Sequence, residues 1–230
     1  MHRPLIADNI AKLLQRVRLS AQKSQRPESD ILLLAVSKTR PADDIRRAYA
    51  CGLDQFGESY LQEALEKIED LADLPLTWHF IGPIQSNKTR PIAEHFQWVH
   101  SIDRLKIARR LSEQRPAALP PLQVCIQVNI SAEGSKSGVP VEQARPLATA
   151  IAAMPGLQLR GLMAIPAKTG GEQSQQQAFA QLRQLFEELR QDFPDMDTLS
   201  MGMSGDLEAA IAEGSTLIRV GTAIFGTRNG

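Results

Sequence analysis

The fold is decided by the stretch Ile31-Leu32-Leu33-Leu34-Ala35-Val36-Ser37-Lys38-Thr39-Arg40-Pro41. Its first six residues are apolar, and a continuous apolar run of this length predicts a strand covered on both faces, as in a parallel sheet. The strand must end before Pro41, because proline cannot donate a hydrogen bond to the sheet and restricts the residue before it. Lys38 is therefore predicted at a carboxyl end of the sheet, where α/β proteins collect their functional groups.

Lys38 has two interpretations at this point. It is either a surface lysine just past a strand, or a partly desolvated amine that loses its proton and attacks an aldehyde. The stretch alone does not separate these two interpretations, so the decision depends on the functional groups that the rest of the chain brings to the same edge of the sheet.

The composition is that of an ordinary soluble globular protein. Of the 230 residues, 43% are hydrophobic and 23% are charged, enough for one large α/β domain or two small ones. Lysine plus arginine and aspartate plus glutamate both number 26, so no net charge attracts a nucleic acid or an acidic membrane surface. The N-terminus has no apolar signal segment, and no apolar run reaches membrane-spanning length, which predicts a cytoplasmic protein. Cys51 and Cys125 form no CxxC pair, and we interpret them as buried small residues in a reducing compartment.

Strand and helix patterns alternate along the chain after a leading helix. The predicted strands are residues 31–37, 54–57, 77–81, 97–101, 122–130, 157–165, 198–203 and 217–225. Strands that alternate with helices predict an α/β fold, a single (β/α)8 TIM barrel with an additional N-terminal helix, as one domain over residues 1–230. The competing fold is an open doubly wound sheet, which needs a glycine-rich phosphate loop after its first strand. Residues 37–41 contain no glycine, and the barrel is therefore favoured.

The ends of the seventh and eighth strands predict a phosphate site. In such barrels phosphate often binds after these two strands. Ser204 lies in a glycine-containing loop, and we expect it to cap the helix over 206–213, whose N–H groups attract an anion. Gly221 and Thr222 offer backbone N–H groups and a hydroxyl at the adjacent strand. The alternative is that these glycines only form turns.

Arg219 is an arginine inside an apolar strand. By the two-residue period of a strand it shares a face with Leu217 and Gly221, so it is predicted to be buried and to need an acceptor. One interpretation is a structural ion pair with Asp206 or Glu58. The other is a hydrogen bond to a ligand, such as a heterocyclic nitrogen or a phosphate.

Pyridoxal 5′-phosphate would satisfy all of these groups together. Its aldehyde would form a Schiff base with Lys38, its phosphate would contact Ser204, Gly221 and Thr222, and its ring nitrogen would face Arg219. A permanently cationic arginine disfavours protonation of the ring nitrogen, which makes the ring a weaker electron sink. Deep carbanion chemistry would therefore be handicapped.

The other polar groups are less informative. The four histidines show no metal-ligand spacing and are predicted to be structural or surface residues. Lys88 and Lys136 add cations to strand-end loops, where solvated charge is the simpler interpretation and transient contact with an anionic ligand is the alternative.

The chain resembles the pyridoxal phosphate homeostasis protein family along nearly its whole length. The segments that carry the resemblance are residues 35–39, 56–63, 78–88, 135–138, 161–166, 199–204 and 219–226. The resemblance implies a barrel like the N-terminal domain of alanine racemases, with the cofactor on Lys38 and the same phosphate and ring contacts. It also implies a cofactor carrier acting in storage, buffering or delivery to pyridoxal phosphate-dependent apoenzymes, without an established catalytic activity of its own.

One position departs from the family. Asparagine is usual in the family's Gly-Glu-Asn-Tyr segment, where this chain has Ser59, so a polar side chain near the ring is kept but shortened. The alternatives are a weak pyridoxal phosphate-dependent racemase or related enzyme, and a cofactor-free phosphate-binding barrel enzyme. A racemase needs acid/base groups on both faces of the substrate carbon. Only Tyr49 and Tyr60 are available as tyrosines, so we expect a protein without catalytic activity. A lone barrel without an obvious dimerisation arm predicts a monomer.

Overall fold

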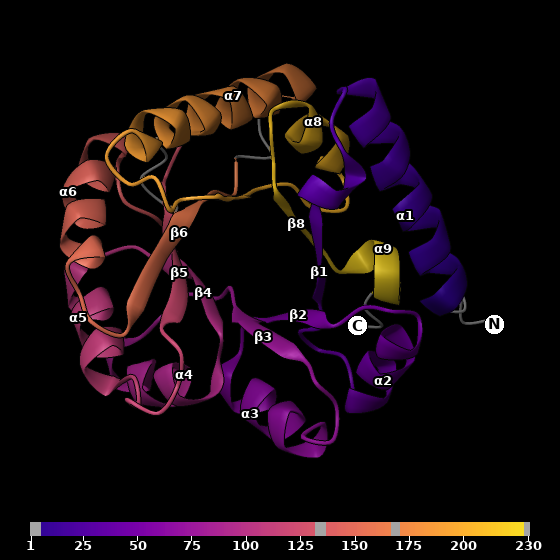
Figure 1. Cartoon of the computed structure of the whole chain (residues 1–230). Coiled ribbons are helices and arrows are strands. Elements are labelled where there is room, and N and C mark those ends of the chain that lie inside the picture. Colours follow the sequence, from indigo (N-terminus) through magenta and orange to yellow (C-terminus); the bar gives the residue numbers. More distant parts are fainter. Residues whose placement is uncertain (1–5, 132–136, 167–170, 228–230) are drawn as a thin grey trace.

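Eight parallel strands close into a barrel in the computed structural model, which describes residues 6–131, 137–166 and 171–227 (Figure 1). The strands are β1 (Leu32–Val36), β2 (Gln55–Glu58), β3 (Thr77–Phe80), β4 (Trp98–Ile102), β5 (Leu122–Gln127), β6 (Leu157–Met163), β7 (Thr198–Ser200) and β8 (Leu217–Val220). Each strand pairs with the next along the chain, and β8 pairs back with β1 from Leu32↔Leu217 to Ala35↔Val220. The predicted (β/α)8 barrel is confirmed.

Helices form the outer layer of the barrel. They are α1 (Ile6–Lys23), α2 (Ala42–Ala50), α3 (Leu61–Asp70), α4 (Thr89–His95), α5 (Leu105–Gln114), α6 (Val141–Ala152), α7 (Gly171–Arg190), α8 (Leu207–Ala212) and α9 (Thr222–Phe225), with 3-10 turns at Glu28–Asp30 and Ser86–Lys88. The additional helix α1 buries Ile10, Leu13 and Val17 against its neighbours α2, α8 and α9. None of the helices in the described part of the chain is both long and apolar enough to cross a membrane.

The predicted eighth strand is too long. The observed strand β8 ends at Val220, the last residue paired with β1, and the apolar residues after Gly221 form α9 instead. The N–H groups of Ile224 and Phe225 both donate to the carbonyl of Gly221, at 3.0 and 2.9 Å. The apolar run therefore continues as a helical turn, and the pairing of β8 with β1 stops at Val220. The predicted fifth and seventh strands are also too long, since β5 ends at Gln127 and β7 at Ser200.

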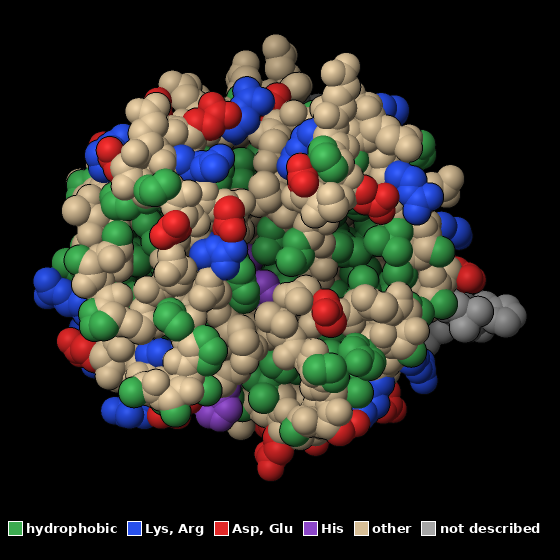
Figure 2. Space-filling view, in the orientation of Figure 1, with side chains coloured by type: hydrophobic (Ala, Val, Ile, Leu, Met, Phe, Trp, Pro, Cys, Tyr) green, Lys and Arg blue, Asp and Glu red, His purple; other side chains and the backbone are tan. Residues whose placement is uncertain are grey.

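The barrel interior is polar near its middle, in contrast to the apolar layer between sheet and helices. Four buried residues with hydrogen-bonding side chains meet there, namely His79, His100, Ser200 and Arg219. Figure 2 shows basic and acidic side chains interspersed on the face in view, without a large patch of one sign. The charge pattern therefore gives no sign of a polyanion-binding surface on this face.

Candidate functional site

Lys38 follows the last residue of β1 by two positions and is half-buried. It sits in a tight turn, in which the N–H of Arg40 donates to the carbonyl of Ser37 at 3.0 Å. Thr39 has a φ of 65°, a left-handed conformation that is strained for a β-branched residue. Such strain persists only where the surroundings impose it, so the turn that carries Lys38 must be held by other groups.

A buried ion cluster lies beneath this turn. We call Glu58, Glu63 and Lys67 the lysine-turn network. Lys67 Nζ donates to Glu58 Oε1 at 2.8 Å and also to Glu63 Oε1. Glu58 is fully buried, and burial raises the pKa of its carboxyl group against the opposing effects of the Lys67 charge and hydrogen bond. Its second oxygen, Oε2, is buried without a hydrogen-bond partner among the described residues.

The lysine-turn network holds the backbone on both sides of Lys38. On one side, the hydroxyl of Ser37 donates to Glu58 Oε1 at 2.6 Å, and the Ser37 carbonyl accepts from Lys67 Nζ at 2.8 Å. On the other side, the N–H of Thr39 donates to the Glu63 carboxylate at 2.5 Å. The network therefore supplies the external restraint that the strained turn requires.

The predicted phosphate residues come together where β7 and β8 end. Ser204 Oγ accepts from the N–H of Ala223, in the first turn of α9, at 3.4 Å. The expectation that Ser204 caps the following helix is wrong, because α8 begins after Asp206 and no side chain caps it. Ser204 instead accepts a hydrogen bond from the first turn of α9, the helix that begins with Thr222.

Two glycines allow the backbone to fit closely at these strand ends. A Cβ at Gly221 would lie 3.1 Å from the carbonyl oxygen of Val36 in β1, which places the start of α9 beside the strand that leads to Lys38. Gly202 has a φ of 96°, and a Cβ there would lie 2.6 Å from Ala210 Cβ. The glycines therefore have a packing role, and their close approach to a ligand stays a prediction.

Arg219 is buried in the barrel interior, with 4% of its surface exposed. Its Nη1 donates to the carbonyl and the hydroxyl of Ser200, both at 2.7 Å, and its Nη2 donates to the Ala164 carbonyl at 2.9 Å. The alternative interpretation, an ion pair with Asp206 or Glu58, is not seen among these described residues. Burial lowers the pKa of Arg219 to about 10, so the side chain stays cationic at neutral pH without a paired carboxylate.

The remaining predicted residues lie at other strand ends. Ser59 directly follows β2 and is half-buried, and its carbonyl oxygen lies close enough to Gly82 to exclude a Cβ there. Lys88 is exposed at the end of a 3-10 turn. Lys136 lies outside the described residues. No group of three or more histidine, cysteine or acidic residues in the described ranges could hold a metal ion.

The polar chain in the barrel interior was missed by sequence reasoning as a connected feature. His79 and His100 were predicted to be structural or surface residues, and both are fully buried. They contact each other, and His100 also contacts Ser200, which in turn contacts Arg219. The alternation of side chains along each strand gives these residues an inward direction, but only the closed barrel brings them into contact.

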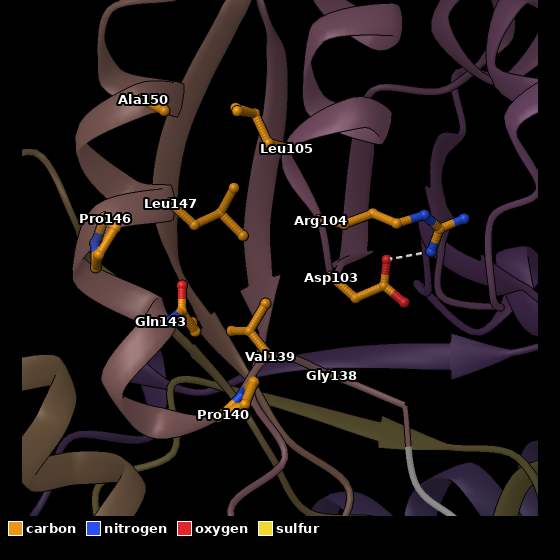
Figure 3. A pocket seen from close by; sticks show the side chains of 10 residues that line it. All are labelled: Asp103, Arg104, Leu105, Gly138, Val139, Pro140, Gln143, Pro146, Leu147 and Ala150. Carbon is orange, nitrogen blue, oxygen red and sulfur yellow. Dashed lines mark hydrogen bonds and ion pairs between the residues drawn. The ribbon is translucent and has the colours of Figure 1, made fainter.

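A cavity of about 420 Å³ lies elsewhere on the molecule, between α5 and α6 (Figure 3). Leu147 and Val139 point toward each other and Leu105 extends toward Ala150, whereas the Arg104 side chain extends away and pairs with Asp103. None of the six predicted cofactor-binding residues lines this cavity. It is therefore separate from the site at the ends of β1, β7 and β8.

Comparisons with known proteins agree with the barrel fold. The family model described as the N-terminal domain of alanine racemase matches residues 8–229. A pyridoxal phosphate homeostasis protein of Pseudomonas aeruginosa is 63% identical over 97% of this chain and 96% of its own length. The protein of the same name from Escherichia coli K12 is 52% identical over 97% of each. The structure of PipY from Synechococcus elongatus PCC7942 with pyridoxal phosphate bound is 40% identical in sequence and has a TM-score of 0.82. That match covers 96% of this chain and 100% of the PipY chain.

Proposed function

The chain belongs to the family of pyridoxal phosphate homeostasis proteins, which share the barrel of the alanine racemase N-terminal domain, and we propose that it holds pyridoxal 5′-phosphate through a Schiff base on Lys38. The support for a bound cofactor is the PipY structure that contains pyridoxal phosphate, which matches this chain over 96% of its length. The support for Lys38 as the attachment point is its place in a restrained turn beside the phosphate residues.

The residues present fit the cofactor. Arg219 carries a buried positive charge whose hydrogen bonds go to two carbonyl groups and one hydroxyl, all neutral acceptors. A buried cation that is not paired with a carboxylate is suited to a ligand that accepts a hydrogen bond. This unpaired interior arginine is the observation that carries the proposal.

Each residue has a distinct part in binding. Lys38 supplies the amine for the covalent bond. The Ser204 and Thr222 hydroxyls and the backbone N–H groups of Gly221 and Thr222 bind the phosphate. Arg219 donates a hydrogen bond to the ring nitrogen and, because it stays cationic, keeps a proton off that nitrogen. Ser59 lies near the ring. When bound, the cofactor supplies a reactive aldehyde and an electron-withdrawing ring.

The biological role that follows is cofactor homeostasis by storage, buffering or delivery. The relatives are named as homeostasis proteins and not as enzymes, which agrees with the prediction of a non-enzymatic role. We propose that the chain acts in the cytoplasm as a single-domain monomer, and that pyridoxal phosphate-dependent apoenzymes receive the cofactor from it. An arginine at the ring nitrogen supports this role, because it limits carbanion chemistry during storage.

Chemical trapping tests the proposal. Reduction of the cofactor-loaded protein with borohydride should leave a pyridoxyl group on the peptide that contains Lys38, as read by mass mapping. The Lys88→Ala variant is the matched control and should be labelled equally, because Lys88 is an exposed lysine in another strand-end loop. An unmodified Lys38 in loaded protein would contradict the proposal.

The enzymatic alternative has its own test. Cofactor-loaded protein is incubated with amino acids in deuterated water, and the exchange of the α-proton is followed by NMR. We expect no exchange above that of free pyridoxal phosphate. Catalysed exchange would show that the chain is an amino-acid enzyme.

A further inference from the structure

A chain of hydrogen bonds crosses the barrel interior below the proposed cofactor ring. We call Arg219, Ser200, His100, His79 and Gln55 the interior chain. Ser200 Oγ lies 2.7 Å from Arg219 Nη1 and 2.8 Å from His100 Nδ1. His100 Nε2 lies 2.9 Å from His79 Nδ1, and His79 Nε2 lies 2.9 Å from Gln55 Oε1. The four contacts therefore form one continuous path from β8 to the start of β2.

The upper end of the interior chain has a fixed direction. A guanidinium group only donates hydrogen bonds, so Ser200 Oγ must accept from Arg219. The hydroxyl proton of Ser200 then has His100 Nδ1 as its acceptor. If His100 Nδ1 carried the proton instead, Ser200 would accept from both neighbours and its own proton would have no acceptor among the described groups. Ser200 is fully buried, so water cannot take that place at low cost.

The Gln55 end of the interior chain independently gives the same direction of hydrogen-bond donation. Gln55 Nε2 donates to Asp54 Oδ1 at 3.2 Å, and a carboxylate only accepts. The Gln55 carbonyl oxygen is therefore the atom that faces His79, and His79 Nε2 must donate to it. His79 Nδ1 is then an acceptor, and it receives the proton of His100 Nε2. The chain runs one way, from a group that only donates to a group that only accepts.

The two histidines are neutral in this arrangement, each with its proton on Nε2. Burial lowers the pKa of His79 to about 3, and burial together with His79 and Arg219 holds the pKa of His100 well below its ordinary value. Their neutrality agrees with the direction that the two ends impose.

We propose that His100 and His79 are positioning residues for Arg219. They hold the Ser200 hydroxyl so that it accepts from the Arg219 guanidinium group. Together with the carbonyls of Ser200 and Ala164, this hydroxyl occupies three of the five N–H donors of Arg219. The N–H on Nε and one on Nη2 have no acceptor among the described residues, and these two donors remain for a ligand. This inference rests on the proposed function, in which that ligand is the ring nitrogen of pyridoxal phosphate.

The direction of the interior chain is tested in the cofactor-free protein. Long-range nitrogen–proton NMR spectra report which ring nitrogen of each histidine carries a proton. We expect both His79 and His100 to be neutral Nε2–H tautomers from pH 5 to pH 8. The exposed His95 serves as a reference signal in the same spectra. A proton on Nδ1, or a charged ring, at either buried histidine would overturn the inference without bearing on Lys38.

The positioning role is tested with two variants of one residue. His100→Gln keeps an acceptor and a donor, and His100→Leu removes both. We expect His100→Leu to weaken binding of pyridoxal phosphate about tenfold and His100→Gln to weaken it less than about threefold, because one strong hydrogen bond corresponds to about a factor of ten. Binding of inorganic phosphate, which uses Ser204 and Thr222, should be unchanged in both.

The pattern of the two ligands separates positioning from general damage. Equal weakening of pyridoxal phosphate and inorganic phosphate by His100→Leu would mean a merely structural role, and no weakening of either would mean no role. If His100→Leu does not fold, the His100→Gln variant and the tautomer spectra still decide. If the unaltered protein binds no pyridoxal phosphate, the proposed function fails while the tautomer result stands.

Discussion

Replacing Lys67 by methionine tests the lysine-turn network most directly. The substitution keeps an apolar side chain of similar length but removes the ammonium group, which donates to Glu58, Glu63 and the carbonyl of Ser37. Glu58 would then be buried without a cation. The turn that carries Lys38 would lose the ammonium group that links the Ser37 carbonyl to Glu63, the acceptor of the Thr39 N–H.

The expected loss of stability is large and depends on pH. Removing one partner of a buried ion pair costs about 3–5 kcal/mol of unfolding free energy. The Glu58 pKa is already raised by burial, and Lys67 is the main influence that lowers it. In the variant this pKa rises further, so the folded state keeps a proton that the unfolded chain has released. Unfolding free energy therefore falls as pH rises between the two pKa values, by about 1.4 kcal/mol for each added unit of pKa difference.

Urea unfolding at pH 5, 6, 7 and 8 measures this effect. We expect the penalty of Lys67→Met to grow with pH and to be largest at pH 8, with an unchanged dependence on urea concentration. Lys12→Met is the matched control, because Lys12 is exposed on α1, and it should change stability by less than about 0.5 kcal/mol. The double variant Glu58→Gln/Lys67→Met should recover much of the loss at pH 8. A penalty that does not vary with pH, or a double variant no more stable than Lys67→Met, would refute the reasoning.

Three further outcomes follow from the structure. Pyridoxal phosphate at about 100 times its dissociation constant should add about 2.7 kcal/mol of stability, or about 5–10 °C in melting temperature, and Lys38→Ala should lose most of this shift in a thermal scan. Gly202→Ala should lower the free energy of unfolding, measured in urea, by about 1–3 kcal/mol, because Gly202 has a φ of 96° and no room for a Cβ, whereas Gly205→Ala, with open space, should have little effect. Ellman's reagent should react with only Cys51 in the folded protein and with both thiols in urea, because Cys125 is buried and burial raises its pKa to about 12. A rapid reaction of two thiols without urea would contradict this.

The barrel and the position of Lys38 could be predicted because both depend on local patterns. A strand covered on both faces leaves an apolar run in the sequence, and the residues just after such runs lie at one end of a parallel barrel. The same pattern misled the prediction after Val220. An apolar run of a few residues suits a buried strand or a buried helical turn equally well, and only the end of pairing with β1 selects the helix.

The two buried networks could not be predicted, because their partners are far apart or resemble surface residues. His100 and Ser200 are 100 residues apart in the sequence, and no local pattern joins them. Glu63 and Lys67 have the four-residue spacing of an ordinary exposed ion pair on a helix. The sequence shows no sign that Lys67 instead faces the sheet, where Glu58 meets it.

The strand β2 links both networks to the proposed cofactor site. Gln55 begins the strand and contacts His79 inside the barrel, whereas Glu58 ends it and contacts Lys67 on the helix side. Residues three positions apart in a strand point to opposite faces, so one short strand supports both groups. Through Glu58 it restrains the turn of Lys38, and through Gln55 it sets the direction of the chain that reaches Arg219. The covalent and the ring-nitrogen contacts proposed for the cofactor therefore share one support, and a change in the register of β2 would disturb both together because each residue would move to the opposite face.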